Sequence, residues 1–172
     1  FIKKMLSYVR TNDFDGINID FEEIHQNDKD HFTHFMDKVY EAFHQHGLMV
    51  TIDVPPKNNS FDYASLATSA DRMIVMLYDQ HHSMSNPGPV APIDWVKESL
   101  NQLNIPSEKL IVSLGSYGYD WEENSGKPAV DMTFRDILEL GSGTNLKIHW
   151  NKETGNPYLR YEKNEKNHIV WF

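Results

Sequence analysis

The fold is decided by the stretch Phe14-Asp15-Gly16-Ile17-Asn18-Ile19-Asp20-Phe21-Glu22-Glu23. Apolar and polar residues alternate along it, and the side chains of a β-strand point alternately to its two faces. The isoleucines and Phe21 therefore share one face, and Asn18, Asp20 and Glu22 share the other. β-Branched and aromatic residues suit packing, so the stretch predicts a strand with one buried face and carboxylates at its carboxyl end.

Asp20 and Glu22 are two residues apart on the polar face, so their Cα atoms lie roughly 6.5–7 Å from each other. At that distance the loss of a proton from one carboxyl group disfavours its loss from the other. A carboxyl group that stays protonated near neutral pH can act as the general acid of glycosidic bond cleavage. The spacing alone is equally compatible with a solvated acidic strand end.

Strands and helices alternate over the first two thirds of the chain. An amphipathic helix over residues 1–12 precedes strands predicted at 14–23, 48–54, 73–79 and 110–115, with helices at 30–46, 63–68 and 94–103 between them. This order predicts an α/β fold with a parallel sheet and right-handed crossovers. If such a sheet closes into a barrel, the carboxyl ends of its strands form the mouth where active sites lie.

The pattern changes from Asp131 onward. A short helix at 133–140 is followed by strands at 146–150, 157–161 and 168–172, with a turn at Thr154-Gly155-Asn156. These segments predict an antiparallel hairpin or meander. We therefore divide the chain into residues 1–130 and residues 131–172.

Composition narrows the class of protein. The 172 residues suffice for one domain with a core, and 40% of them are hydrophobic. A net charge of −9 argues against nucleic acid or an anionic membrane as partner. There is no cysteine, and no run of about 18 apolar residues that could span a membrane. The chain starts at Phe1 rather than Met, so we expect it to be a piece of a longer protein.

Three motifs resemble those of glycoside hydrolase family 18, the chitinases and their relatives. Asp15–Glu22 is similar to the family's D-G-x-D-x-D-x-E signature, with Asn18 at its third acidic position. Met76-Leu77-Tyr78-Asp79 is similar to the M-x-Y-D motif that ends the sixth barrel strand, and Gly115–Trp121 to the segment after the seventh. The resemblance is strongest to the bacterial cell-wall and spore-cortex glucosaminidases and to the related domain fused to polysaccharide deacetylases.

The resemblance implies an architecture and a reaction. The fold would be a (β/α)8 TIM barrel, of which the chain covers roughly strands 4 to 7 plus a small α+β insertion at 131–172. Glu22 would be the proton donor, Asp20 would orient the substrate's 2-acetamido group, and Tyr78 would donate a hydrogen bond to that group. The acetamido oxygen attacks the anomeric carbon in this family, so no enzyme nucleophile and no cofactor is needed. Asn18 cannot ionise, so it cannot trade charge with Asp20.

Other residues are expected around the substrate. Asp79 would contact the substrate or Glu22, Met76 would line the pocket, and Asn18 would lie beside the acids. Tyr117, Tyr119 and Trp121 alternate at a strand end, where they either stack on sugar rings or pack beneath the hairpin. Asp15 would hold the strand by hydrogen bonds, and Gly16 would allow close backbone approach. Nine histidines show no H-E-x-x-H spacing, and no metal site is predicted.

The sequence thus predicts a glycosidase that cleaves β-1,4 bonds of an N-acetylglucosamine-containing polysaccharide of the chitin or peptidoglycan type. The alternatives are a non-catalytic, carbohydrate-binding chitinase-like domain and an inactive fragment. A partial barrel leaves two sheet edges exposed, which favours self-association. The resemblance alone implies an extracellular or cell-envelope location in a bacterium.

Overall fold

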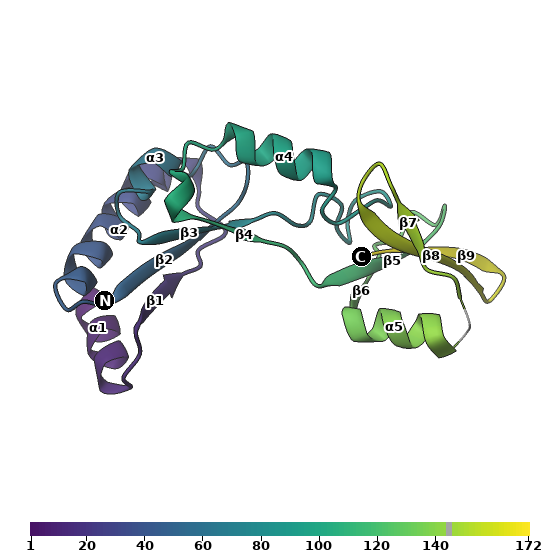
Figure 1. Ribbon diagram of the computed structural model, residues 1–172, viewed down its shortest axis with the longest axis horizontal. Coiled ribbons are helices and arrows are strands. Elements are labelled where there is room, and N and C mark those ends of the chain that lie inside the picture. Colours follow the sequence, from purple (N-terminus) through teal and green to yellow (C-terminus); the bar gives the residue numbers. More distant parts are fainter. Residues whose placement is uncertain (144–145) are drawn as a thin grey trace. The chain divides into compact units, whose positions relative to one another are not determined.

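The strands of the chain form two separate sheets, one parallel and one antiparallel (Figure 1). The computed structural model describes residues 1–143 and 146–172. The helices and strands in chain order are α1 (Ile2–Thr11), β1 (Gly16–Ile19), the 3-10 helix η1 (Gln26–Asp28), α2 (Lys29–His44), β2 (Met49–Val54), α3 (Tyr63–Leu66), β3 (Arg72–Met76), α4 (Ile93–Gln102), the 3-10 helix η2 (Ser107–Lys109), β4 (Leu110–Ser113), β5 (Tyr117–Glu122), β6 (Val130–Thr133), α5 (Phe134–Gly143), β7 (His149–Asn151), β8 (Asn156–Lys163) and β9 (Lys166–Trp171).

The parallel sheet belongs to a first compact unit, made of Phe1–Met76 and Gln102–Ser113. Its strand order is β1-β2-β3-β4, so each strand pairs in parallel with the next strand along the chain. Parallel neighbours need a crossover connection, and helices lie in the segments between consecutive strands. The parallel sheet predicted from the alternation of strands and helices is confirmed.

One face of this sheet is covered and the other carries the polar residues. Ile19, Val50, Ile52 and Val54 are at most 3% exposed, and α2 contacts β2 with a buried stripe of its own. In Figure 1, α1 and α2 lie on the same side of the sheet. Because neighbours in a strand alternate, the residues between these buried ones point to the opposite face.

Helix α2 ends because Gly47 adopts a left-handed backbone conformation with φ +69°. The Leu48 N–H donates to the Phe43 carbonyl oxygen at 3.2 Å, and the Gly47 N–H donates to the His44 carbonyl oxygen at 3.0 Å. This pair of bonds satisfies carbonyl groups of the last helical turn. The helix predicted over residues 30–46 is confirmed as α2, which ends at His44, and β2 begins at Met49.

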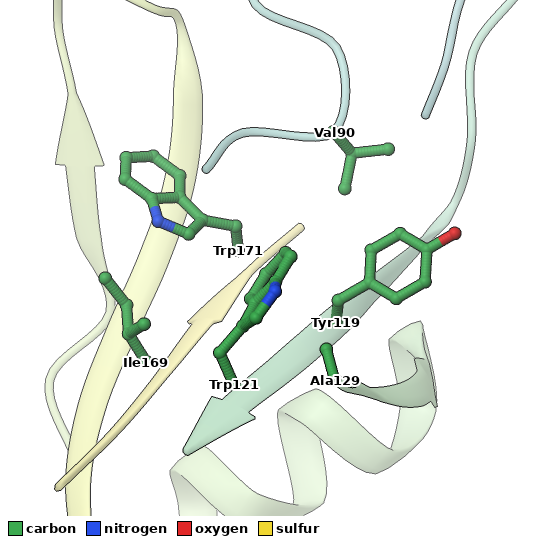
Figure 2. Packing of buried hydrophobic residues seen from close by; sticks show 6 residues of the cluster. All are labelled: Val90, Tyr119, Trp121, Ala129, Ile169 and Trp171. Atoms are coloured by element: carbon green, nitrogen blue, oxygen red, sulfur yellow. The ribbon is translucent and has the colours of Figure 1, made fainter. Parts of the chain in front are cut away.

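The antiparallel sheet belongs to a second compact unit, made of Leu77–Asn101 and Leu114–Phe172. Its strand order is β6-β5-β9-β8-β7. One hydrophobic cluster of this unit is shown in Figure 2, where Tyr119, Trp121 and Trp171 gather with the aliphatic side chains of Val90, Ala129 and Ile169. A second cluster joins Ile137 of α5 to Leu159 and Val170 of the sheet.

The ends predicted for two strands of the parallel sheet were wrong. The strand predicted to end at Gly115 ends at Ser113, and the strand predicted to end at Asp79 ends at Met76. Tyr117–Glu122 is not a strand end but a separate strand, β5, which pairs with β6 and β9. The antiparallel arrangement predicted after Asp131 is confirmed, but it includes these two additional strands, β5 and β6.

No helix in residues 1–143 or 146–172 has the length and the apolar character needed to cross a membrane.

Candidate active site

The predicted acidic stretch forms β1 and the extended segment that follows it. Ile19 is 3% exposed, and the Phe21 ring stacks on Phe35 of α2 with 5.8 Å between ring centroids. The alternation therefore continues past the end of β1, and its apolar side packs on α2. Asp20 and Glu22 are both exposed and alternate with these residues, which directs their side chains away from α2.

Gly16 begins β1 at a point where the backbones of β1 and β2 come very close. A Cβ atom added there would overlap the backbone carbonyl oxygen of Met49 on β2. The Met49 N–H donates to the Asp15 carbonyl oxygen at 2.9 Å, which joins the two strands just before β1. Only glycine fits without a shift of the backbone, and the Asp15–Gly16 pair thereby sets the position of the acidic strand relative to β2.

Asn18 is held by two side chains of β2. Its Oδ1 accepts a hydrogen bond from Thr51 Oγ1, and its Nδ2 donates to Asp53 Oδ2, both at 2.6 Å. The register pairs Asn18 with Thr51 and Ile19 with Ile52. Asp53 therefore comes level with Asp20 on the polar face of the sheet. The sequence analysis did not identify Asp53, although it alternates with buried Val and Ile residues as Asp20 does.

The surroundings of Asp53 favour its protonated form. Partial burial raises the pKa of Asp53, the hydrogen bond from Asn18 opposes that change, and the negative charge of Asp20 raises the pKa further. The polar face thus carries two acids of unlike surroundings, Asp20 in water and Asp53 half-buried. Met76 lies on the same face of β3 as Ile74, which pairs with Asp53, and is itself half-buried.

In the second unit, Asp79 is fixed by two phenols. Its Oδ1 accepts hydrogen bonds from Tyr117 Oη at 2.5 Å and from Tyr119 Oη at 2.7 Å. Asp79 itself adopts a left-handed backbone conformation with φ +62°. Burial raises the pKa of both tyrosines, and the hydrogen bonds to Asp79 raise it further, so both phenols stay neutral donors. Tyr78 contacts Tyr117 edge-on, with 6.1 Å between ring centroids.

Trp121 lies in the hydrophobic cluster of Figure 2 rather than on the surface. It is 2% exposed, and its Nε1–H donates to the Ser85 carbonyl oxygen at 3.1 Å. Its ring has almost no face left for a sugar in this conformation. Of the three alternating aromatic residues, Tyr117 and Tyr119 support Asp79 and Trp121 packs beneath the antiparallel sheet. Among the described residues, no three His, Asp or Glu side chains gather as they would around a metal ion.

Comparison with known proteins agrees with the motifs. The family model for glycosyl hydrolases family 18 matches residues 1–172. A Bacillus subtilis protein that carries the name sporulation-specific glycosylase YdhD is 30% identical over 99% of the chain, and its crystal structure superposes with a TM-score of 0.94, covering 61% of that structure's chain. The cortical fragment-lytic enzyme of B. subtilis is 24% identical over 99% of the chain and 43% of its own length.

A chitinase from Chromobacterium violaceum has a related structure, with a TM-score of 0.90 and 27% identity over 99% of this chain and 57% of that one. The chain spans about half the length of the curated relatives it matches. The α/β fold with one parallel and one antiparallel sheet is the fold of these chitinase-like proteins. The chain belongs to family 18 of the glycosyl hydrolases.

Proposed function

We propose that the protein hydrolyses β-1,4 bonds next to N-acetylglucosamine in a polysaccharide of the chitin or peptidoglycan type. The proposal is supported by the segment that follows β1, in which Phe21 stacks on Phe35 of α2 while its neighbours Asp20 and Glu22 are exposed. Family membership supports the reaction class, and the names of the relatives, which include a chitinase and a cortical fragment-lytic enzyme, support the substrate class.

In this proposal each acidic residue has a separate role. Glu22 protonates the leaving oxygen of the glycosidic bond, and Asp20 accepts a hydrogen bond from the acetamido N–H of the substrate. The acetamido oxygen then displaces the leaving group from the anomeric carbon, and water opens the resulting ring with net retention of configuration. Tyr78 donates a hydrogen bond to the acetamido group, Asp79 and Met76 contact the sugar, and Asn18 supports Asp20 from within the sheet.

We further propose that β1 to β4 are four consecutive strands, the fourth to the seventh, of a (β/α)8 barrel. The strictly parallel order of the sheet and the relatives, roughly twice as long as this chain, support this arrangement. Cell-wall polymers lie outside the cytoplasmic membrane. We therefore propose an extracellular or cell-envelope location in a bacterium, which the B. subtilis relatives also support.

The test is the pair of variants Glu22→Gln and Glu23→Gln in the full-length protein. Both residues are exposed and adjacent in sequence, but only Glu22 belongs to the motif. Loss of a general acid lowers the rate by about 100- to 10,000-fold, so Glu22→Gln should lose nearly all hydrolysis of the sugar–sugar bonds of an N-acetylglucosamine oligomer. Glu23→Gln should keep it.

Both variants should melt at the parental temperature, because each changes one exposed side chain. Equal hydrolysis by the two variants would contradict the role of Glu22. Tight oligosaccharide binding without any hydrolysis by the parent protein would instead indicate a carbohydrate-binding domain.

A further inference from the structure

Two carboxylates stand side by side on neighbouring strands of the parallel sheet. Asp20 follows β1 and Asp53 lies in β2, and the register of the two strands brings these residues level on the same face. Neighbouring strands are about 4.8 Å apart, so the two acids are close enough to share a proton or to repel one another. Asp53 belongs to none of the three motifs described above, and no role has been assigned to it so far.

The side chain of Asp53 is held in place by an amide whose orientation is itself fixed. Thr51 Oγ1 donates to Asn18 Oδ1, which leaves the Asn18 NH2 group pointing at Asp53 Oδ2. An amide nitrogen can only donate, so Asp53 Oδ2 acts as the acceptor. A proton on Asp53 is then best placed on Oδ1, the oxygen that does not receive the Asn18 N–H.

Burial and a neighbouring charge raise the pKa of Asp53, and the hydrogen bond from Asn18 lowers it. Asp20 is the charged neighbour that raises the pKa of Asp53, in addition to the effect of burial. From β3, the uncharged Ile74 pairs with Asp53. Arg72, the cation on that strand, directs Nη1 to the Asp71 carbonyl oxygen at 2.8 Å. The charge that raises the pKa of Asp53 is therefore that of Asp20.

We propose that Asp53 is a positioning residue of the active site, which keeps the single proton of the Asp20–Asp53 pair so that Asp20 retains its negative charge. The inference rests on the proposed function, because the retained charge on Asp20 is what accepts the acetamido N–H of the substrate. No covalent bond changes in this step, and the proton stays on Asp53 throughout. Asn18, which cannot ionise, holds the side chain of Asp53 on β2 through its hydrogen bond.

The first test compares Asp53→Leu with Asp53→Asn in the full-length protein. Leucine fills the space but makes no hydrogen bond, and misplacement of a reacting group by about 1 Å lowers the rate on the order of 100-fold, so kcat/KM should fall by about 10- to 100-fold. Asparagine has the shape and hydrogen bonding of a protonated carboxyl group and should rescue most of that loss. Asparagine does not ionise in this pH range. The rate of Asp53→Asn should therefore not decrease where the parent loses the proton of Asp53 as the pH rises.

The second test is independent of hydrolysis. Carboxyl carbon NMR of the full-length protein should show Asp53 taking up its proton above the ordinary aspartate value of about 3.9, and Asp20→Asn should lower that midpoint. A midpoint at the ordinary value, or one that Asp20→Asn leaves unchanged, would overturn the proposal. So would an Asp53→Asn variant as impaired as Asp53→Leu. Absence of hydrolysis by the parent protein would count against the proposed function, whereas the titration decides the Asp20–Asp53 pair by itself.

Discussion

At the scale of single residues, Asp79 shows how a side chain near the end of a predicted motif is positioned. The resemblance to M-x-Y-D identified Asp79 and Tyr78 as neighbours in sequence, but the structure adds two phenols that donate to one carboxylate oxygen. Hydrogen bonds to a charged group stabilise by about 1.5–3 kcal/mol each. Tyr117 and Tyr119 thus fix Asp79 despite its left-handed backbone conformation.

This arrangement predicts a specific loss of stability at alkaline pH. The pKa of Tyr117 in the folded protein lies above its unfolded value of about 10. The neutral phenol therefore stabilises the folded state fully below about pH 10, and that contribution is lost as the pH rises through the folded pKa. The free energy of unfolding, measured by urea denaturation at several alkaline pH values, should fall more steeply with pH in the parent than in Tyr117→Phe.

Tyr8→Phe is the matched control, because Tyr8 is 63% exposed. It should keep the parental slope of stability against pH. The same slope in the parent and in Tyr117→Phe would show that the hydrogen bond to Asp79 does not hold the phenol neutral.

The residues of the site differ in how far they could be predicted from sequence. The faces of β1 follow from local alternation, so the separation of Asp20 and Glu22 from Ile19 and Phe21 could be predicted. The partner of Asn18 could not, because it depends on the register of β1 against β2, which no feature of either strand alone determines. Tyr117 was expected either to stack on sugar or to pack, and its bond to Asp79 depends on a contact 38 residues away.

At the scale of elements, the junction of β1 and β2 connects packing to the candidate site. Gly16 leaves no room for a side chain against the Met49 carbonyl. The same two strands carry Asp20, Asn18 and Asp53 a few residues further on. We expect a displacement at the start of β1 to shift the acids, because β1 is paired with β2 along its whole length, from Gly16 to Ile19.

Gly16→Ala should destabilise the protein and reduce its activity together. Forcing a methyl group into closely packed surroundings costs about 1–3 kcal/mol. Thermal denaturation and kcat/KM of the full-length variant measure the two effects. The control is Gly143→Ala, because a Cβ atom at Gly143 meets no other atom within 4 Å. A Gly16→Ala protein with parental stability and parental activity would mean that the two strands are not held this closely.

Elements with a clear periodicity could be predicted, and the short strand β6 could not. The helix over residues 30–46 was predicted from local features and is confirmed as α2 (Lys29–His44). β6 has only four residues, and three of them are exposed, so it has no apolar alternation to detect. The turn between β8 and β9 uses Asn164 and Glu165, both with positive φ. Glutamate is an uncommon residue in such a turn, so this turn could not be predicted.

At the scale of the whole molecule, the parallel sheet has two outer strands, β1 and β4. Outer strands expose unpaired N–H and C=O groups that can pair with another chain. The outer strand β4 also exposes hydrophobic side chains, because Ile111 and Val112 are 41% and 43% exposed. In the proposed barrel, both edges would be paired with further strands.

The 172-residue polypeptide expressed by itself should therefore self-associate, whereas the full-length protein should not do so through these strands. Gel filtration with light scattering measures the molar mass of the 172-residue polypeptide and of the full-length protein. Association of the short polypeptide through its outer strands should increase with its concentration. Lysine substitutions at Ile111 and Val112 should reduce it, because charged side chains on an outer strand oppose edge-to-edge pairing. A compact monomer of the 172-residue polypeptide at high concentration would contradict this expectation.

In the proposed reaction, Glu22 donates a proton to the leaving group. The most direct measurement compares kcat/KM of the parent and of Glu22→Gln on two N-acetylglucosaminides, one with a dinitrophenolate leaving group and one with a sugar leaving group. Dinitrophenolate departs without protonation, so the variant should lose little on that substrate and about 100- to 10,000-fold on the other. Equal losses on both substrates would contradict the assignment of Glu22 as the general acid.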